Sequence, residues 1–245
     1  MSIPFNYAHY PSLAGKRVLV TGGGSGIGAG IVAAFQQQGA DVFFIDLPAS
    51  APAPGFIPCD LTDLDALAGA LATLLEGGAI DVLVNNAAND DRHTVQQVTP
   101  QYWDERMAVN LRHLFFCAQA VAPGMAANGG GAILNLGSIS WHLAQANLSL
   151  YMTAKAAIEG LTRGLARDLG GDRIRVNCII PGSVITPRQA RWHSPEGEAH
   201  ILGAQCLHER VLIEDIAAMA LFLGSDNAAR CTGRDYYVDA GWYGA

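Results

Sequence analysis

A glycine-rich loop near the N-terminus constrains the fold of this chain more than any other feature. The loop, Thr21–Gly28, has the sequence TGGGSGIG and stands directly between an apolar run and a stretch with apolar residues at helical spacing. Glycine permits a tight turn and a close approach of the backbone to a ligand. The first N–H groups of the following helix would attract phosphate. Some loops of this kind are only turns, but this placement favours a dinucleotide site. The loop residues predicted to bind the dinucleotide are Gly22, Gly24, Ser25, Gly26 and Ile27.

Short apolar runs alternate with amphipathic stretches along the rest of the chain. Most runs are continuous, as expected for parallel strands covered on both faces. The predicted strands are Arg17–Val20, Val42–Asp46, Phe56–Cys59, Val82–Asn85, Ala132–Leu136, Arg175–Ile180 and Tyr236–Val238. Helices are predicted after the glycine loop, over Thr62–Leu75 with Thr62 as N-cap, and over Pro100–Ala122, Ser149–Leu169 and Glu214–Leu223. We expect one α/β domain over residues 1–245, with a doubly wound, seven-stranded parallel sheet and helices on both faces.

Composition excludes several classes of protein. The net charge of −7 argues against nucleic-acid binding, which needs a basic surface. No apolar run approaches the roughly 18 residues of a membrane span, and Met1–Gly15 lacks the pattern of a secretory signal. We therefore expect a cytoplasmic protein without a membrane partner. The five cysteines and seven histidines are scattered without metal-ligand spacing, so no metal site is expected.

An acidic residue ends the second predicted strand. Asp46 follows Gly22 by 24 residues, and a carboxylate at this position can accept hydrogen bonds from the adenosine ribose of a dinucleotide. It would repel the additional phosphate of NADP, and no Arg or Lys stands beside it or in the loop. An acid at a strand end can also be merely solvated. Together with the glycine loop, Asp46 favours NAD over NADP.

Tyr151 and Lys155 are separated by four residues early in a predicted helix, so their side chains share one face. Lysine is scarce here, because Lys16 is the only other one. A nearby ammonium favours the phenolate of tyrosine, which would let Tyr151 exchange a proton with an alcohol. Spacing alone is equally compatible with an ordinary amphipathic helix. Ser138 follows a predicted strand at the sheet edge where ligands bind, and could hydrogen-bond the reacting oxygen.

Five motifs in order make the chain resemble the short-chain dehydrogenase/reductase family over nearly its whole length. They are the glycine loop, Asp60, the Asn85–Ala88 segment with Asn110, Ser138 with Tyr151-x-x-x-Lys155, and Pro181-Gly182. The resemblance implies a Rossmann-type domain, a homotetramer, and the catalytic set Asn110, Ser138, Tyr151 and Lys155. It implies further cofactor contacts from Asp60, Leu61, Asn86, Ala87, Ala88, Tyr151, Lys155, Pro181, Gly182, Val184 and Thr186.

Within that resemblance, Asp60 would hold the adenine and Asn86 would line the cofactor cleft. Asn110 would anchor a water that links Lys155 to solvent, while Lys155 would also bind the nicotinamide ribose. Val184 and Thr186 would hold the carboxamide of the cofactor. Ala88 departs from the family, which most often has glycine at this position, and this small change leaves the assignment intact.

Two segments, Asn89–His93 and Ser138–His142, together with the end Asp239–Tyr243, resemble bacterial aldose 1-dehydrogenases, the D-xylose type above all. A sugar needs polar and aromatic partners at the carboxyl ends of strands, although each candidate could equally be a loop residue bonded to backbone or water. The residues predicted to contact sugar are Asn89, Ser138, His142, Asn147, Tyr151, Gln189 and Trp192, beneath a lid over residues 186–208.

The resulting expectation is an NAD-dependent enzyme that oxidises the anomeric carbon of a pentose or hexose to an aldonolactone. One alternative is a dehydrogenase for another hydroxyl or ketone, in a deoxy-sugar acid, a polyol or a 3-oxoacyl substrate. A more remote alternative is a dinucleotide-sensing protein without activity. Such a protein would be expected to lack part of the catalytic set, which is complete here.

Overall fold

The sheet has seven parallel strands in the order β3-β2-β1-β4-β5-β6-β7 among the residues that the computed structural model describes, namely 6–47, 49, 53–186, 189 and 194–244. The strands are β1 (Arg17–Thr21), β2 (Asp41–Asp46), β3 (Phe56–Pro58), β4 (Val82–Asn85), β5 (Gly131–Leu136), β6 (Ile174–Pro181) and β7 (Asp235–Val238). All seven correspond to predicted strands, with ends that differ by at most one residue. The strand order reverses between β1 and β4, which are direct neighbours.

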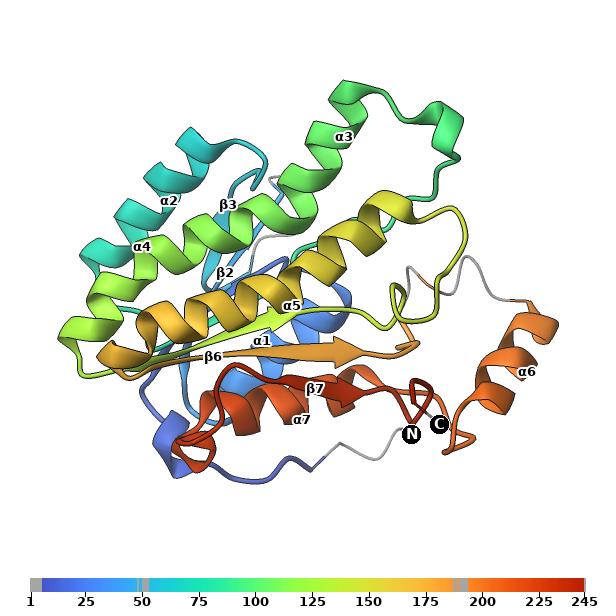
Figure 1. Cartoon of the computed structure of the whole chain (residues 1–245). Coiled ribbons are helices and arrows are strands. Elements are labelled where there is room, and N and C mark those ends of the chain that lie inside the picture. Colours follow the sequence, from blue (N-terminus) through green and yellow to red (C-terminus); the bar gives the residue numbers. More distant parts are fainter. Residues whose placement is uncertain (1–5, 48, 50–52, 187–188, 190–193, 245) are drawn as a thin grey trace.

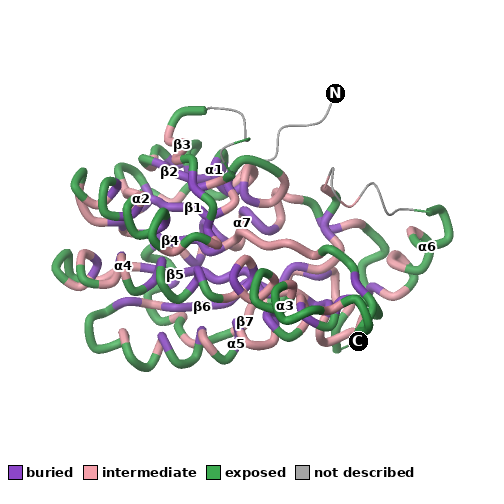
Figure 2. Tube along the Cα trace, turned by 90° about the horizontal axis from the view of Figure 1, so that it is seen from above, coloured by how far each residue is buried: buried purple, intermediate pink, exposed green. Residues whose placement is uncertain are grey.

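Helices cover both faces of the sheet (Figure 1). Helices α1 (Gly26–Gln37) and α7 (Ile213–Gly224) lie on one face, and α2 (Leu64–Glu76), α4 (His113–Ala127) and α5 (Ser149–Leu169) lie on the other. Successive strand residues point to opposite faces: Val18 and Val20 pack in the core of α1 and α7, while Leu19 packs in the core of α2, α4 and α5. Figure 2 shows the consequence, with buried residues along the central strands and exposed residues on the outer turns of the helices. The predicted fold class is confirmed.

The single helix predicted over Pro100–Ala122 is wrong in one respect. The structure has α3 (Pro100–Met107), then a π-helical turn over Ala108–Arg112, and then α4, which continues to Ala127. A π turn inserts one residue into the helical register, and such insertions often occur at functional sites. Apolar periodicity averages over a single inserted residue and cannot show it. The turn contains Asn110, one of the predicted catalytic residues.

The predicted N-cap of the second helix is also wrong. Asp63 caps α2, and its side chain accepts hydrogen bonds from the backbone N–H groups of Asp65 and Ala66. The Thr62 side chain does not cap the helix: its hydroxyl donates to Asp60 Oδ1 at 2.8 Å, and its backbone N–H donates to the same oxygen at 2.9 Å. Thr62 and Asp63 are both good capping residues, and the neighbouring carboxylate of Asp60 engages the threonine.

A further helix, α6 (Pro195–Ala204), lies within the segment predicted to be a lid. It stands away from the sheet beyond the carboxyl ends of the strands (Figure 1). Ser194 caps it by accepting a hydrogen bond from Gly197 N–H. Among the described residues, no helix combines the length and the apolar character that a membrane crossing requires.

Candidate active site

The glycine loop follows β1 and the Asn86–Ala88 segment follows β4, so the two meet where the strand order of the sheet reverses. Open α/β sheets bind ligands in the crevice at such a point. Thr21 and Asn86 join the two sides. Thr21 Oγ1 accepts from the backbone N–H groups of Asn86 and Ala87, at 3.0 and 3.1 Å. The Asn86 side-chain amide donates to the carbonyls of Thr21 and Gly22, both at 3.0 Å. Asn86 therefore supports the loop as well as lying in the crevice.

Gly22 and Gly28 of the loop have no room for a side chain. Gly22 has a φ of +68°, and a Cβ built on it would lie 2.8 Å from Ala87 Cα. A Cβ on Gly28 would collide with the carbonyl oxygen of Gly22. The first glycine thus permits the turn, and the second permits α1 to pack closely against β1.

The start of α1 fits an anionic group. Ser25 is the N-cap, and within the described part of the chain its side chain makes no capping hydrogen bond, nor does an acidic residue stand in the first turn. The first N–H groups of the helix are therefore left for a ligand such as a pyrophosphate. Gly26 has a φ of +53°, and a Cβ there would meet only Thr186, whose methyl carbon would be 3.8 Å away. Thr186, which follows β6, thus lies beside the loop.

The acidic residues predicted to bind the adenosine portion lie near the loop. Asp46 Oδ2 accepts from Gly24 N–H at 2.7 Å, and its Oδ1 accepts from Leu47 N–H at 2.8 Å. The carboxylate is thereby fixed at the end of β2 next to the loop. Asp60 is oriented by Thr62, as described above, and Leu61 is buried in the core with α2. These groups fit a dinucleotide, and their individual contacts with it stay predictions.

Tyr151 and Lys155 lie together in the first two turns of α5. Lys155 Nζ is 5.4 Å from the centroid of the Tyr151 ring, and it donates to the Leu136 carbonyl at 2.7 Å. Lys155 is 3% exposed. Burial lowers the pKa of Lys155 to about 8, against the opposing attraction of Cys178 and Asp90. His113 adds no charge at neutral pH, because burial lowers the pKa of its imidazole to about 4.

Ser138 begins the turn that follows β5. Its Oγ accepts from Ser140 N–H at 3.1 Å. Backbone bonds from Gly137 N–H to the Ile179 carbonyl (2.8 Å) and from Ile139 N–H to the Pro181 carbonyl (3.2 Å) hold the turn against β6. Gly182 N–H donates to the Val238 carbonyl at 2.9 Å, which fixes the Pro181-Gly182 pair between this turn and β7.

Asn110 is completely buried in the π turn. Its Oδ1 accepts from Asn89 N–H at 2.8 Å, and its Nδ2 donates to the Asn89 carbonyl at 3.0 Å. The side chain therefore fixes the backbone of Asn89, the first residue of a loop predicted to bind sugar. Asn110 is placed to couple the π turn to that loop, and its role toward a relay water stays a prediction.

The structure describes three of the other four predicted sugar contacts. Asn147 is exposed with a φ of +62°. His142 is bonded to Glu159 and Tyr237, at 3.0 and 3.1 Å. Gln189 accepts a hydrogen bond from Ser183 Oγ at 3.4 Å. Trp192 lies outside the described residues.

Three residues that link these segments were missed in the sequence. His93 is buried, and its Nε2 lies 3.0 Å from Ser149 Oγ and 3.4 Å from Leu150 N–H, so it caps α5 from another loop. Arg210 donates to the carbonyl of Ser183 at 3.2 Å and pairs with Glu198 on α6. Glu159 is buried beside Trp141 and His142. No motif marks them, because their partners are distant in sequence.

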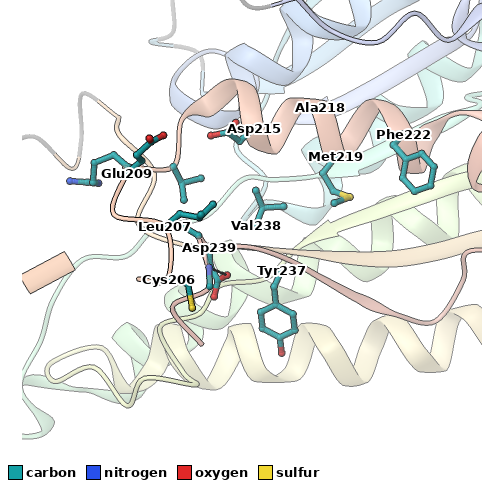
Figure 3. A pocket seen from close by; sticks show the side chains of 14 residues that line it. Cys206, Leu207, Glu209, Asp215, Ala218, Met219, Phe222, Tyr237, Val238 and Asp239 are labelled. Carbon is teal, nitrogen blue, oxygen red and sulfur yellow. Dashed lines mark hydrogen bonds between the residues drawn. The ribbon is translucent and has the colours of Figure 1, made fainter. Parts of the chain in front are cut away.

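A cavity of about 710 Å³ lies elsewhere, between α7, β7 and the segments that follow α6 and β7 (Figure 3). Met219 and Phe222 of α7 line it, with Val238 and Asp239 at the end of β7. Its lining includes none of the predicted catalytic residues. We therefore do not assign the reaction to it.

Comparison with known proteins fits this site. Residues 22–243 match the family model described as Enoyl-(Acyl carrier protein) reductase. The chain belongs to the short-chain dehydrogenase/reductase family, which confirms the resemblance found in the sequence.

The similar proteins include sugar dehydrogenases. A D-xylose 1-dehydrogenase of Caulobacter vibrioides is 56% identical, over 96% of this chain and 98% of its own length. A probable galactose dehydrogenase of Rhizobium meliloti is 44% identical, over 98% and 99%. The solved structure of Thermoplasma acidophilum aldohexose dehydrogenase is 27% identical, with a TM-score of 0.88 over 95% of this chain and 96% of its own.

Proposed function

We propose that this enzyme oxidises the anomeric hydroxyl of an aldose, a pentose or hexose, to an aldonolactone with NAD+. The observation that carries the proposal is the buried Lys155 beside Tyr151, close to the turn of Ser138 at the edge of the cofactor crevice. The similarity to a D-xylose 1-dehydrogenase and a probable galactose dehydrogenase supports an aldose as the substrate. We propose further that Asn89, Asn147, Gln189 and Trp192 contact the sugar beneath a lid that includes α6.

Each residue has a chemical role that follows from its position. Tyr151, as phenolate, takes the proton of the anomeric hydroxyl. Lys155 stabilises that phenolate by its positive charge, which water does not screen because the ammonium is buried. Ser138 donates a hydrogen bond to the reacting oxygen and fixes its orientation. A nicotinamide cofactor held by the start of α1 and by the segments around Asp60, Asn86 and Thr186 would supply the acceptor for the hydride of the anomeric carbon.

The choice of NAD rests on Asp46. Its carboxylate is fixed beside the loop by Gly24 and Leu47, where it would accept hydrogen bonds from the ribose hydroxyls and repel a phosphate. The start of α1, Thr186, and the segments around Asp60 and Asn86 supply the rest of the proposed cofactor site.

The test is a panel of aldoses, polyols and sugar acids offered to the purified enzyme with NAD+ or NADP+, while the absorbance of the reduced cofactor is followed. A reverse assay with a 3-oxoacyl thioester and NADH or NADPH covers the 3-oxoacyl alternative that the sequence left open. We expect turnover of an aldose with NAD+. Turnover confined to polyols, sugar acids or the thioester would refute the sugar assignment. The variant Tyr151→Phe should bind NAD+ but lose turnover, and an active variant would refute its role.

We also propose a homotetramer in the cytoplasm. Phe115 and Phe116 on α4 are 42% and 36% exposed, and Tyr237 on the edge strand β7 is 38% exposed. Exposed apolar side chains are available for contacts between subunits. All five cysteines are free thiols, as expected in a reducing compartment.

A further inference from the structure

A cluster of polar and aromatic side chains joins four separate segments on the α5 side of β7. Glu159 on α5 is its centre and is 6% exposed. One oxygen, Glu159 Oε1, accepts from Trp141 Nε1 at 2.8 Å and from His142 Nε2 at 3.0 Å. Tyr237 on β7 and Tyr243 near the C-terminus complete the cluster. The ring centroids of Trp141 and Tyr243 lie 3.7 and 4.2 Å from the ring centroid of His142.

A carboxylate in this position needs these partners. Burying an ionised carboxyl group is costly unless charge-assisted hydrogen bonds replace water. The side chain of His142 is only 4% exposed, so neither partner of the pair is in water. The two bonds to Oε1 therefore fix Trp141 and His142 firmly to α5.

Both residues belong to the turn that starts at Ser138. Within this turn Ser138 Oγ accepts from Ser140 N–H, Leu143 N–H donates to the Ile139 carbonyl (3.0 Å), and Gln145 N–H donates to the Ser140 carbonyl (3.2 Å). Glu159 follows Lys155 by one helical turn on the same helix as Tyr151. Glu159 therefore links the turn that begins at Ser138 to the helix that carries Tyr151 and Lys155.

We propose that Glu159 is a positioning residue for Ser138: it fixes the turn over residues 138–145 to α5, and thereby sets the place of the Ser138 hydroxyl relative to Tyr151. The inference rests on the proposed function, because it assumes that Ser138 acts on the reacting oxygen. A displacement of about 1 Å in such a group can reduce turnover by about a hundredfold. If Glu159 only stabilised the fold, its loss would lower stability without a specific connection to Ser138.

A double-mutant cycle separates these two roles. We expect Glu159→Ala to lower kcat by about 10- to 100-fold in the wild-type background, with NAD+ affinity unchanged. In the Ser138→Ala background the same substitution should lower kcat by less than about twofold, because the hydroxyl that it positions is already absent. Equal losses in the two backgrounds, or an unimpaired Glu159→Ala enzyme, would overturn the proposal.

Further variants keep the test sharp. Glu159→Gln retains an oxygen that can accept from Trp141 and His142, so its kcat should stay within about threefold of wild type. If Glu159→Gln lowered kcat as much as Glu159→Ala does, the proposal would be overturned. If Glu159→Ala fails to fold, Trp141→Phe removes one donor with little change of shape and enters the same cycle. Gln38→Ala is the control, since Gln38 is a buried polar residue whose side chain bonds only Tyr10 N–H and the Ala8 carbonyl in the described structure. It should lower stability and leave kcat unchanged in both backgrounds.

Crystal structures of the Glu159→Ala and Gln38→Ala proteins test the same inference without turnover. The bond from Ser140 N–H to Ser138 Oγ should be broken or the turn displaced in the first protein and retained in the second. A turn unmoved in Glu159→Ala would overturn the proposal. Because this measurement needs no substrate, a wild-type enzyme that oxidises no aldose would refute the proposed function and leave the positioning role to be decided by the crystals.

Discussion

Replacing Lys155 by methionine should change how stability depends on pH. Methionine keeps an unbranched chain, one atom shorter than that of lysine, and removes the buried charge. Burial lowers the pKa of Lys155 from 10.5 to about 8, a difference that corresponds to about 3 kcal/mol at about 1.4 kcal/mol per pH unit. The folded protein carries this electrostatic cost at neutral pH, where Lys155 is charged.

The sign follows from proton binding. Below pH 8 both the folded and the unfolded wild-type chain hold the Lys155 proton, so this residue gives no pH dependence. Between pH 8 and 10.5 the folded state has lost the proton and the unfolded state keeps it, so the free energy of unfolding rises with pH. Methionine has no proton to lose. The wild type should therefore gain about 3 kcal/mol over Lys155→Met between pH 7.5 and 10.5.

Urea unfolding at a series of pH values, followed by circular dichroism at one protein concentration, measures this difference. The loss of the hydrogen bond to the Leu136 carbonyl adds a cost of about 1–3 kcal/mol to the variant at neutral pH, so only the pH-dependent part is diagnostic. Lys16→Met is the matched control, since the Lys16 side chain is 42% exposed, and it should show no comparable rise. A difference between wild type and Lys155→Met that stays flat across this range would refute the electrostatic cost assigned to burial.

Three further outcomes are expected. The double variant Asp46→Ser, Leu47→Arg should raise the ratio of kcat/KM for NADP+ over NAD+ by about tenfold or more, because it removes a carboxylate that repels the additional phosphate of NADP+ and adds a guanidinium that attracts it. An unchanged ratio would contradict the role of Asp46. Gly22→Ala should lower Tm far more than Gly15→Ala, because both glycines have a positive φ but only Gly22 is packed against Ala87. Equal decreases in Tm would mean that alanine costs only the backbone strain of about 1–2 kcal/mol at either position. Phe115→Glu should reduce the assembly to smaller species in light scattering, and an intact tetramer would exclude α4 from the subunit contacts.

The strands of the sheet could be predicted from the sequence because each one is marked by its own short run of residues. Buried parallel strands are continuous apolar runs, so all seven were found, and the glycine loop located the crevice between β1 and β4. The π turn around Asn110 was not found, since one inserted residue leaves the apolar periodicity almost unchanged. Thr62 and Asp63 are both good caps, and the carboxylate of Asp60 decided between them.

The side chains around the predicted sugar site were harder to place. His142 was predicted from its position after a strand, yet its Nε2 is bonded to Glu159, seventeen residues away, and to Tyr237, ninety-five residues away. His93 and Arg210 likewise owe their positions to distant partners. Pairings of this kind depend on how α5, β7 and the lid segment pack, and no short motif encodes them.

The bonds between Thr21 and Asn86 have a consequence for the order of events during synthesis. These residues are 65 positions apart, and their hydrogen bonds join the two walls of the crevice. A growing chain cannot complete the crevice until β4 has left the ribosome and paired with β1. A nascent chain should therefore not be retained on immobilised dinucleotide before Asn86 and Ala87 have emerged, so ligand capture sets a lower limit on the chain length at which β1 pairs with β4.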